Sequence, residues 1–195
     1  METSRRTVLA SAAAAGLTAS FAGTSYASAG RTPTKELFGR LADGTKVYRW
    51  SLANGGTRMK VLSYGGIVQS LELPDRHGRY TNVSLGYDTI EAYVAGTTFF
   101  GALIGRYGNR IAKGRFTLDG KTHQLSVNDG ENSLHGGAKG FNTRVWDVEP
   151  FAGSTGVGLV LRYVSVDGEM GYPGTLRVKV TYTLTARGDW RIDYA

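Results

Sequence analysis

The feature that most limits the fold of this chain is the alternation of apolar and polar residues in short runs. The clearest run covers residues 175–185, where Val178, Val180, Tyr182 and Leu184 alternate with arginine, lysine and threonine. Successive side chains of a strand point to opposite faces, so this pattern predicts a strand with one buried face. The chain also has 28 glycines, many of them in Asp-Gly or Gly-Gly pairs that mark turns. Because long stretches with a helical period are missing, the sequence predicts an all-β fold.

Other runs of the same kind extend along the chain. The predicted strands are 46–52, 57–63, 67–73, 121–127, 158–164 and 189–195. We expect the last of these to pair with 175–185 through the turn at Arg187-Gly188. One short helix is predicted at Thr89–Val94, with Asp88 as its N-cap. Short strands separated by regular turn signals, without an internal repeat or a linker, indicate one domain with an antiparallel sandwich or barrel.

Residues 1–29 have the three-part pattern of an export signal. They contain the twin-arginine start Ser4-Arg5-Arg6-Thr7-Val8-Leu9, an alanine-rich run and the small-residue sequence Ala27-Ser28-Ala29. We therefore expect a Tat-type signal peptide at 1–29 and a mature domain at 30–195. The expected location is extracellular or in the cell envelope of a bacterium. The apolar run is too short and weakly apolar for a comfortable membrane span, so we expect no membrane partner after signal removal.

Composition and charge argue against several classes of function. The chain carries 23 Lys and Arg against 16 Asp and Glu, a net charge of +7. The basic residues are spread over alternating strand positions instead of forming a run, so we expect solvated strand faces and no nucleic-acid partner. The chain has no cysteine. A disulfide framework, a thiolate nucleophile and a cysteine-based zinc site are therefore excluded.

Two polar clusters lie in the stretch Phe100–Gly137. One contains Arg106, Asn109 and Arg110, and the other contains Asn132 and His135. The strand-like run between them is flanked by turns, so a hairpin could bring the clusters together. Guanidinium, amide and imidazole groups would then suit the hydroxyls of a sugar. The residues leave a plainer interpretation open, in which one arginine pairs with Asp129 or Glu131 and Asn109 caps a turn.

The chain has three histidines. His77 lies in a turn and is predicted to be exposed, and His123 lies in a strand run. His135 precedes Gly136-Gly137, where the backbone can approach a ligand closely. A functional His135 and a structural one that bonds a loop carbonyl both remain open. A single histidine without further ligands is a poor metal site, so we expect no metal.

Three motifs together resemble those of the aldose 1-epimerase (galactose mutarotase) family. They are FGALIGRYGNRIAKG at 100–114, NSLHGG at 132–137 and DGEMGYPG at 167–174. Tyr64-Gly65-Gly66 and the segment 82–87 fit the same family, and the resemblance covers about residues 36–195. It implies a galactose mutarotase-like antiparallel β-sandwich (a supersandwich) that interconverts the α and β anomers of a free hexose such as glucose or galactose. The reaction needs no metal or organic cofactor, so none is expected.

The resemblance also implies which residues bind the substrate. Asn109, Arg110 and His135 match the family's sugar contacts, with His135 in a supporting role and not as the principal acid. The family's acid is a second histidine and its base a late glutamate, and neither has a counterpart in this sequence. The resemblance therefore implies a truncated N-terminal part of an aldose 1-epimerase, which we expect to be inactive in isolation. The alternatives are a non-catalytic carbohydrate-binding β-sandwich and a remnant without a ligand. The oligomeric state and the preferred sugar stay open.

Overall fold

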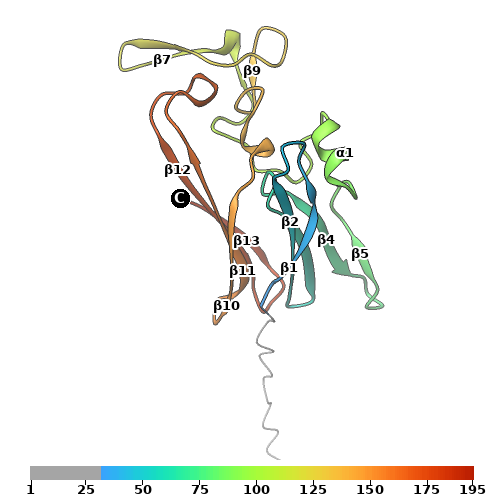
Figure 1. Ribbon diagram of the computed structural model, residues 1–195. Coiled ribbons are helices and arrows are strands. Elements are labelled where there is room, and N and C mark those ends of the chain that lie inside the picture. Colours follow the sequence, from blue (N-terminus) through green and yellow to red (C-terminus); the bar gives the residue numbers. More distant parts are fainter. Residues whose placement is uncertain (1–31) are drawn as a thin grey trace, which may run out of the picture.

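The computed structural model describes residues 32–195, and the predicted signal peptide lies outside these residues (Figure 1). Two antiparallel sheets dominate the fold. The first has the order β1-β2-β3-β4-β5. Its strands are β1 (Thr34–Arg40), β2 (Lys46–Asn54), β3 (Thr57–Leu62), β4 (Val68–Pro74) and β5 (Tyr80–Asn82). The second has the order β10-β11-β12-β13. Its strands are β10 (Asp147–Gly153), β11 (Gly156–Ser165), β12 (Leu176–Leu184) and β13 (Trp190–Tyr194).

Smaller elements connect the two sheets. Two short ladders lie in the connection, β6 (Arg110–Ile111) with β9 (Ser133–Leu134), and β7 (Arg115–Leu118) with β8 (Lys121–Gln124). The helical elements are α1 (Ile90–Ala95) and three 3₁₀ turns, η1 (Ala112–Gly114), η2 (Phe141–Thr143) and η3 (Glu169–Gly171). The β7–β8 hairpin projects from the upper end of the molecule, above the tip of the second sheet (Figure 1). This hairpin is called the arm below.

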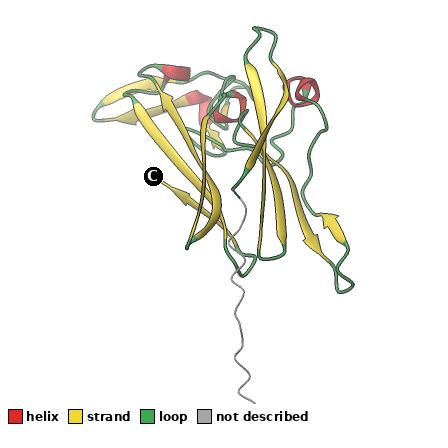
Figure 2. Ribbon diagram, turned by 60° about the horizontal axis from the view of Figure 1, so that its bottom comes forward, coloured by secondary structure: helices red, strands yellow, loops and turns green. Residues whose placement is uncertain are grey.

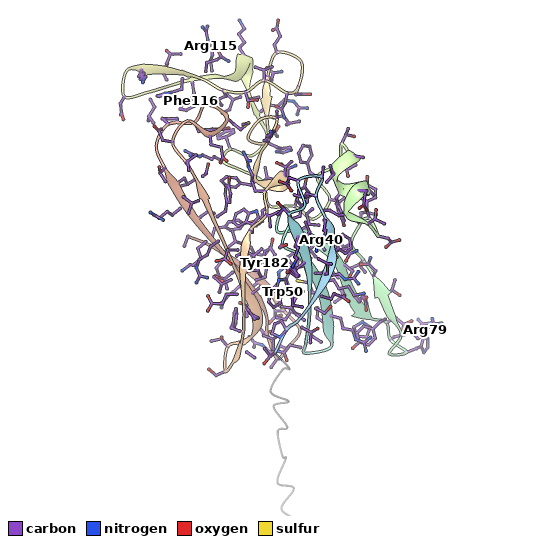
Figure 3. All side chains as sticks on the ribbon, in the orientation of Figure 1. Arg40, Trp50, Arg79, Arg115, Phe116 and Tyr182 are labelled. Atoms are coloured by element: carbon purple, nitrogen blue, oxygen red, sulfur yellow. The ribbon has the colours of Figure 1, made fainter. Side chains whose placement is uncertain are left out.

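The main core lies between the two sheets, which face each other in the two views (Figures 1 and 2). Met59 and Val61 from β3 pack in one cluster with Leu159 and Leu161 from β11, and each of these four side chains is at most 1% exposed. Trp50 and Tyr182 also lie between the sheets (Figure 3). Full burial of each such aliphatic side chain contributes roughly 1.5–3 kcal/mol to stability. The predicted antiparallel sandwich is therefore confirmed.

The predicted faces of β12 are largely correct. Val180, Tyr182 and Leu184 are buried, and Val178 is half-buried. Thr183 is the exception, because it lies on the predicted polar face and is 2% exposed. The pairing of β13 with β12 is confirmed by the register Tyr182↔Ile192.

Two local predictions were wrong. The helix is capped by Thr89, whose Oγ1 accepts a hydrogen bond from the N–H of Ala92, and not by Asp88. The strand predicted at 121–127 ends at Gln124. Beyond Gln124 the main chain leaves the arm. The N–H of Leu125 donates to the carbonyl of Gly114, and the N–H of Ser126 donates to the carbonyl of Met170.

The two sheets are tied together at the end opposite the arm. The side-chain amide of Asn54 donates to the carbonyl of Leu184 at 2.9 Å, and Thr57 Oγ1 donates to the carbonyl of Gly188 at 2.9 Å. The turn glycines approach so closely that a Cβ on Gly55 would lie 2.1 Å from the nitrogen of Gly188. From this joint the sheets diverge, and the segment between α1 and β10 occupies the wider end (Figure 1).

Candidate functional site

The two polar clusters meet on the β6–β9 ladder. Arg110 pairs with Leu134 in this ladder, and the pairing continues one residue further. There the N–H of His135 donates to the carbonyl of Asn109 at 3.0 Å, and the N–H of Asn109 donates to Nδ1 of His135 at 3.0 Å. A hairpin thus brings Asn109 and His135 into direct contact, as the sequence predicted.

Close backbone approach shapes the loop around His135. His135 has a left-handed φ of +52°, and the following Gly136 has a φ of +93°. A Cβ on Gly136 would lie 1.8 Å from the carbonyl oxygen of Gly105, so no other residue fits there. The imidazole makes an edge-on contact with Phe99, with 4.6 Å between the ring centroids. These contacts hold a half-buried imidazole at the mouth of the loop.

The hydrogen bond to Nδ1 fixes how His135 can bind a ligand. A nitrogen that accepts a main-chain N–H carries no proton itself, so the neutral ring has its proton on Nε2. His135 therefore presents Nε2–H as a hydrogen-bond donor.

Arg110 is exposed and ion-paired at the same time. Its Nε lies 2.6 Å from Oδ2 of Asp129, and its Nη1 donates to Oδ1 of Asn109 at 3.3 Å. The side chains of Arg110 and Asp129 are 54% and 35% exposed. The plainer interpretation of the sequence, an arginine paired with Asp129, is therefore confirmed for Arg110. The pairing still leaves N–H groups of the guanidinium without an acceptor among residues 32–195.

The guanidinium of Arg106, in contrast, is hydrogen-bonded within the protein. Its guanidinium donates to Ser165 Oγ at 2.8 Å and to the carbonyls of Ser165, Val166 and Pro173 at 2.8–3.0 Å. These bonds join the first motif to the loop that carries the third motif. Arg106 is therefore an anchor between loops.

A half-buried carboxylate lies beside this anchor. Glu169, 12% exposed, pairs with Arg144 at 2.8 Å and accepts hydrogen bonds from the hydroxyls of Tyr163 (2.5 Å) and Ser165. Burial, reinforced by the bond to Glu169, raises the pKa of Tyr163 to about 12. Sequence reasoning missed this network, because Arg144, the β11 residues Tyr163 and Ser165, and Glu169 share no single motif, although Glu169 lies inside the third motif.

A cavity of about 520 Å³ adjoins Arg110. It is lined by Arg106, Tyr107, Arg110, Ile111, Phe116 and Tyr172. Phe116 belongs to the arm (Figure 3), and Tyr172 follows η3. Aromatic walls with a few polar groups are typical of small-molecule sites. Sequence reasoning missed these aromatics, although Tyr107 and Tyr172 lie inside two of the three motifs.

Other candidate residues lie elsewhere. Asn132 serves the loop, since its Oδ1 accepts the N–H of Lys113 at 3.2 Å. His77 is exposed in the β4–β5 turn, and His123 stacks on Phe116 within the arm at 5.3 Å. Among residues 32–195 no three His, Cys, Asp or Glu side chains gather as metal ligands would. Within the same residues, no helix is both long and apolar enough to cross a membrane.

Comparison with known proteins gives one consistent result. Residues 48–195 match the family model for aldose 1-epimerase. The chain is 43% identical over 162 residues to galactose mutarotase of Bos taurus, covering 83% of this chain and 46% of the relative. It is 37% identical over 132 residues to aldose 1-epimerase of Escherichia coli K12, covering 68% and 37%.

The structure agrees with the sequence matches. The crystal structure of galactose 1-epimerase from Lactobacillus acidophilus NCFM superposes with a TM-score of 0.72 at 29% identity, covering 82% of this chain and 46% of that one. The chain thus spans about half the length of the relatives that it matches. On its family-model match, its sequence identity and its β-sandwich, the chain belongs to the aldose 1-epimerase family.

Proposed function

We propose that this chain supplies hexose-binding groups of an aldose 1-epimerase, an isomerase that interconverts the α and β anomers of free hexoses such as glucose and galactose. The observation that carries the proposal is the contact between Asn109 and His135, which lie 26 positions apart in two different motifs and next to Arg110. Membership of the family supports the reaction class. An exported protein of a bacterial envelope, as the first 29 residues predict, would meet free sugars there.

The chemistry explains the choice of groups. Mutarotation removes a proton from the anomeric hydroxyl, delivers one to the ring oxygen, and opens the ring to the aldehyde. Rotation about the carbon–carbon bond and closure on the other face give the second anomer. Nε2–H of His135 is suited to donate to the ring oxygen, and the free N–H groups of Arg110 are suited to hydroxyl oxygens. The exposed amide of Asn109 adds a donor and an acceptor.

A second candidate, sugar binding without turnover, also has an observation in its favour. The two carboxylates described above are both ion-paired, Asp129 with Arg110 and Glu169 with Arg144. Each carboxylate is engaged by the guanidinium of its partner, and a missing acid or base costs about 10²–10⁴ in rate. We therefore propose that the acid and the base of the reaction are not among residues 32–195, and that this chain by itself binds hexose but does not isomerise it.

Titration of the ¹⁵N-labelled chain with glucose and galactose, followed by NMR, tests the binding. We expect saturable shifts at the amides of Asn109, Arg110 and His135. Arg110→Ala and His135→Ala should each weaken binding, whereas Arg115→Ala, an exposed arginine of the arm that contacts Gln124, should not. Shifts that are absent, or equally strong in Arg110→Ala, would contradict the proposed site.

A further inference from the structure

The ion pair between Arg110 and Asp129 contributes little to folding, because both side chains are substantially exposed. It nevertheless occurs at the residue best placed to bind a ligand. Resting on the proposed function, we propose that Asp129 determines specificity: it positions Arg110 for a neutral sugar and disfavours sugars that carry a phosphate.

The first part of the argument is positional. Oδ2 of Asp129 accepts from Nε of Arg110 at 2.6 Å, and Oδ1 of Asn109 accepts from Nη1 at 3.3 Å. Two acceptors on different sides of the guanidinium restrict a long side chain that is otherwise free to rotate. The entropy of ordering the arginine is then lost before the ligand arrives, which favours binding.

Asp129 is itself held by the framework that carries Arg110. Its N–H and carbonyl exchange hydrogen bonds with Asn132 at 3.1 and 2.9 Å. The side chain of Asn128 bonds both main-chain groups of Leu134, at 3.0 and 2.7 Å. Leu134 is the residue paired with Arg110 across the β6–β9 ladder. The carboxylate and the guanidinium therefore belong to one small, cross-linked unit.

The second part of the argument is electrostatic. An arginine that lines a cavity with free N–H groups and no carboxylate partner attracts phosphate, because those groups match phosphate oxygens. Arg106 lines the same cavity, but its guanidinium already donates to Ser165, Val166 and Pro173. With Asp129 at 2.6 Å, the pair is close to neutral overall and the carboxylate repels a second anion. The remaining N–H groups of Arg110 still serve hydroxyl oxygens. Repulsion of the wrong ligand is a recognised route to specificity.

The test compares glucose with glucose 6-phosphate in NMR titrations of the chain and of Asp129→Asn. We expect Asp129→Asn to weaken glucose binding by roughly three- to tenfold, since the arginine is less restricted, and to tighten glucose 6-phosphate binding by a similar factor. Glu131→Gln makes the same change of charge two residues away on an exposed side chain, and it should leave both affinities unchanged. The Nε–H signal of Arg110 should exchange faster with water in Asp129→Asn only.

The outcomes separate this inference from the proposed function. If Arg110→Ala abolishes glucose binding while Asp129→Asn retains the wild-type ratio of the two affinities, only the role of Asp129 is overturned. Equal effects of Glu131→Gln and Asp129→Asn overturn it as well, because net charge alone would then explain the change. If the unchanged chain fails to bind glucose, both proposals are overturned.

Discussion

The N–H of Asn109 donates to Nδ1 of His135 across 3.0 Å, although 26 residues separate the two in the chain. The bond places the imidazole by a main-chain group and not by a side chain. Main-chain groups are present whatever the residue, so the position of His135 depends on the course of the backbone at 105–109. The chemical state of the imidazole and the shape of that loop are therefore linked.

A first prediction concerns the tautomer of His135. Because Nδ1 accepts a hydrogen bond, the neutral ring should carry its proton on Nε2 in nearly all molecules. Long-range ¹H–¹⁵N correlation spectra at neutral to alkaline pH report the protonated nitrogen directly. A mixture of tautomers at His135, like that of an unrestrained histidine, would show that this hydrogen bond is absent in solution.

A second prediction concerns Gly136. In Gly136→Ala the new methyl group would collide with the carbonyl of Gly105 at a φ of +93°, so we expect a loss of roughly 2–4 kcal/mol in unfolding free energy. Gly120→Ala is the matched control. Its φ is +75° with open space around the site, and it should lose only about 1–2 kcal/mol. Urea denaturation measures both, and equal losses would rule out a steric role for Gly136.

A third prediction concerns the half-buried carboxylate of Glu169. In Glu169→Gln, Arg144 keeps its charge in a half-buried site without a countercharge, so we expect a loss of roughly 2–4 kcal/mol. Glu149→Gln removes an ion pair with Arg162 whose side chains are 67% and 46% exposed, and it should lose less than about 1 kcal/mol. Urea denaturation measures both variants. Equal losses of unfolding free energy in Glu169→Gln and Glu149→Gln would contradict the larger contribution expected of the Glu169–Arg144 pair.

A fourth prediction follows from the raised pKa of Tyr163. The folded state prefers the neutral phenol, with a pKa of about 12 against about 10 when unfolded. The stability that the folded protein gains from a neutral Tyr163 is fully present below about pH 10. It is lost as the pH rises from about 10 through about 12. Tyr163→Phe cannot ionise, so its stability should fall less steeply than wild type over this range. Parallel stability curves for the two proteins above pH 10 would contradict the prediction.

A fifth prediction concerns catalysis by the chain itself. Polarimetry of freshly dissolved α-glucose and α-galactose should show the same approach to anomeric equilibrium with and without the chain, because the proposed acid and base are not among residues 32–195. Acceleration that persists after purification and disappears in His135→Ala would place an acid and a base among residues 32–195. His123 and His77 would then be the first candidates for the acid.

The sequence predicted the sheets well, because their buried strands alternate clearly. The strands that it missed carry weak patterns for physical reasons. β1 lies at a sheet edge and exposes most of its residues, and β10 is an edge strand that contains Pro150. Proline is tolerated at an edge, where its missing N–H is not needed for pairing. A strand that is short, or that pairs with a neighbour on one side only, therefore shows no clear alternation of apolar and polar residues in the sequence.

The candidate site was predicted in part for a similar reason. Asn109, Arg110 and His135 are close in the sequence to the turns that join them, so motif spacing could place them together. The pairing of Arg110 with Asp129 could be stated only as an alternative, because Glu131 offers the same charge two residues away. The aromatic wall and the Glu169 network come from elements that approach one another only after folding. Local pattern carries no information about such contacts.

The joint at Asn54 and Thr57 has a consequence for how the molecule opens. The two sheets are cross-linked there by Leu184 and Gly188, whereas the arm at the other end is a separate two-stranded ladder. Thermal fluctuations should therefore separate strands first at the arm and last at the joint, so amide protons of β7 and β8 should exchange in sub-global openings. One wall of the 520 Å³ cavity is Phe116 of that arm. Movement of the arm would then widen and narrow the cavity on a timescale far shorter than that of global unfolding.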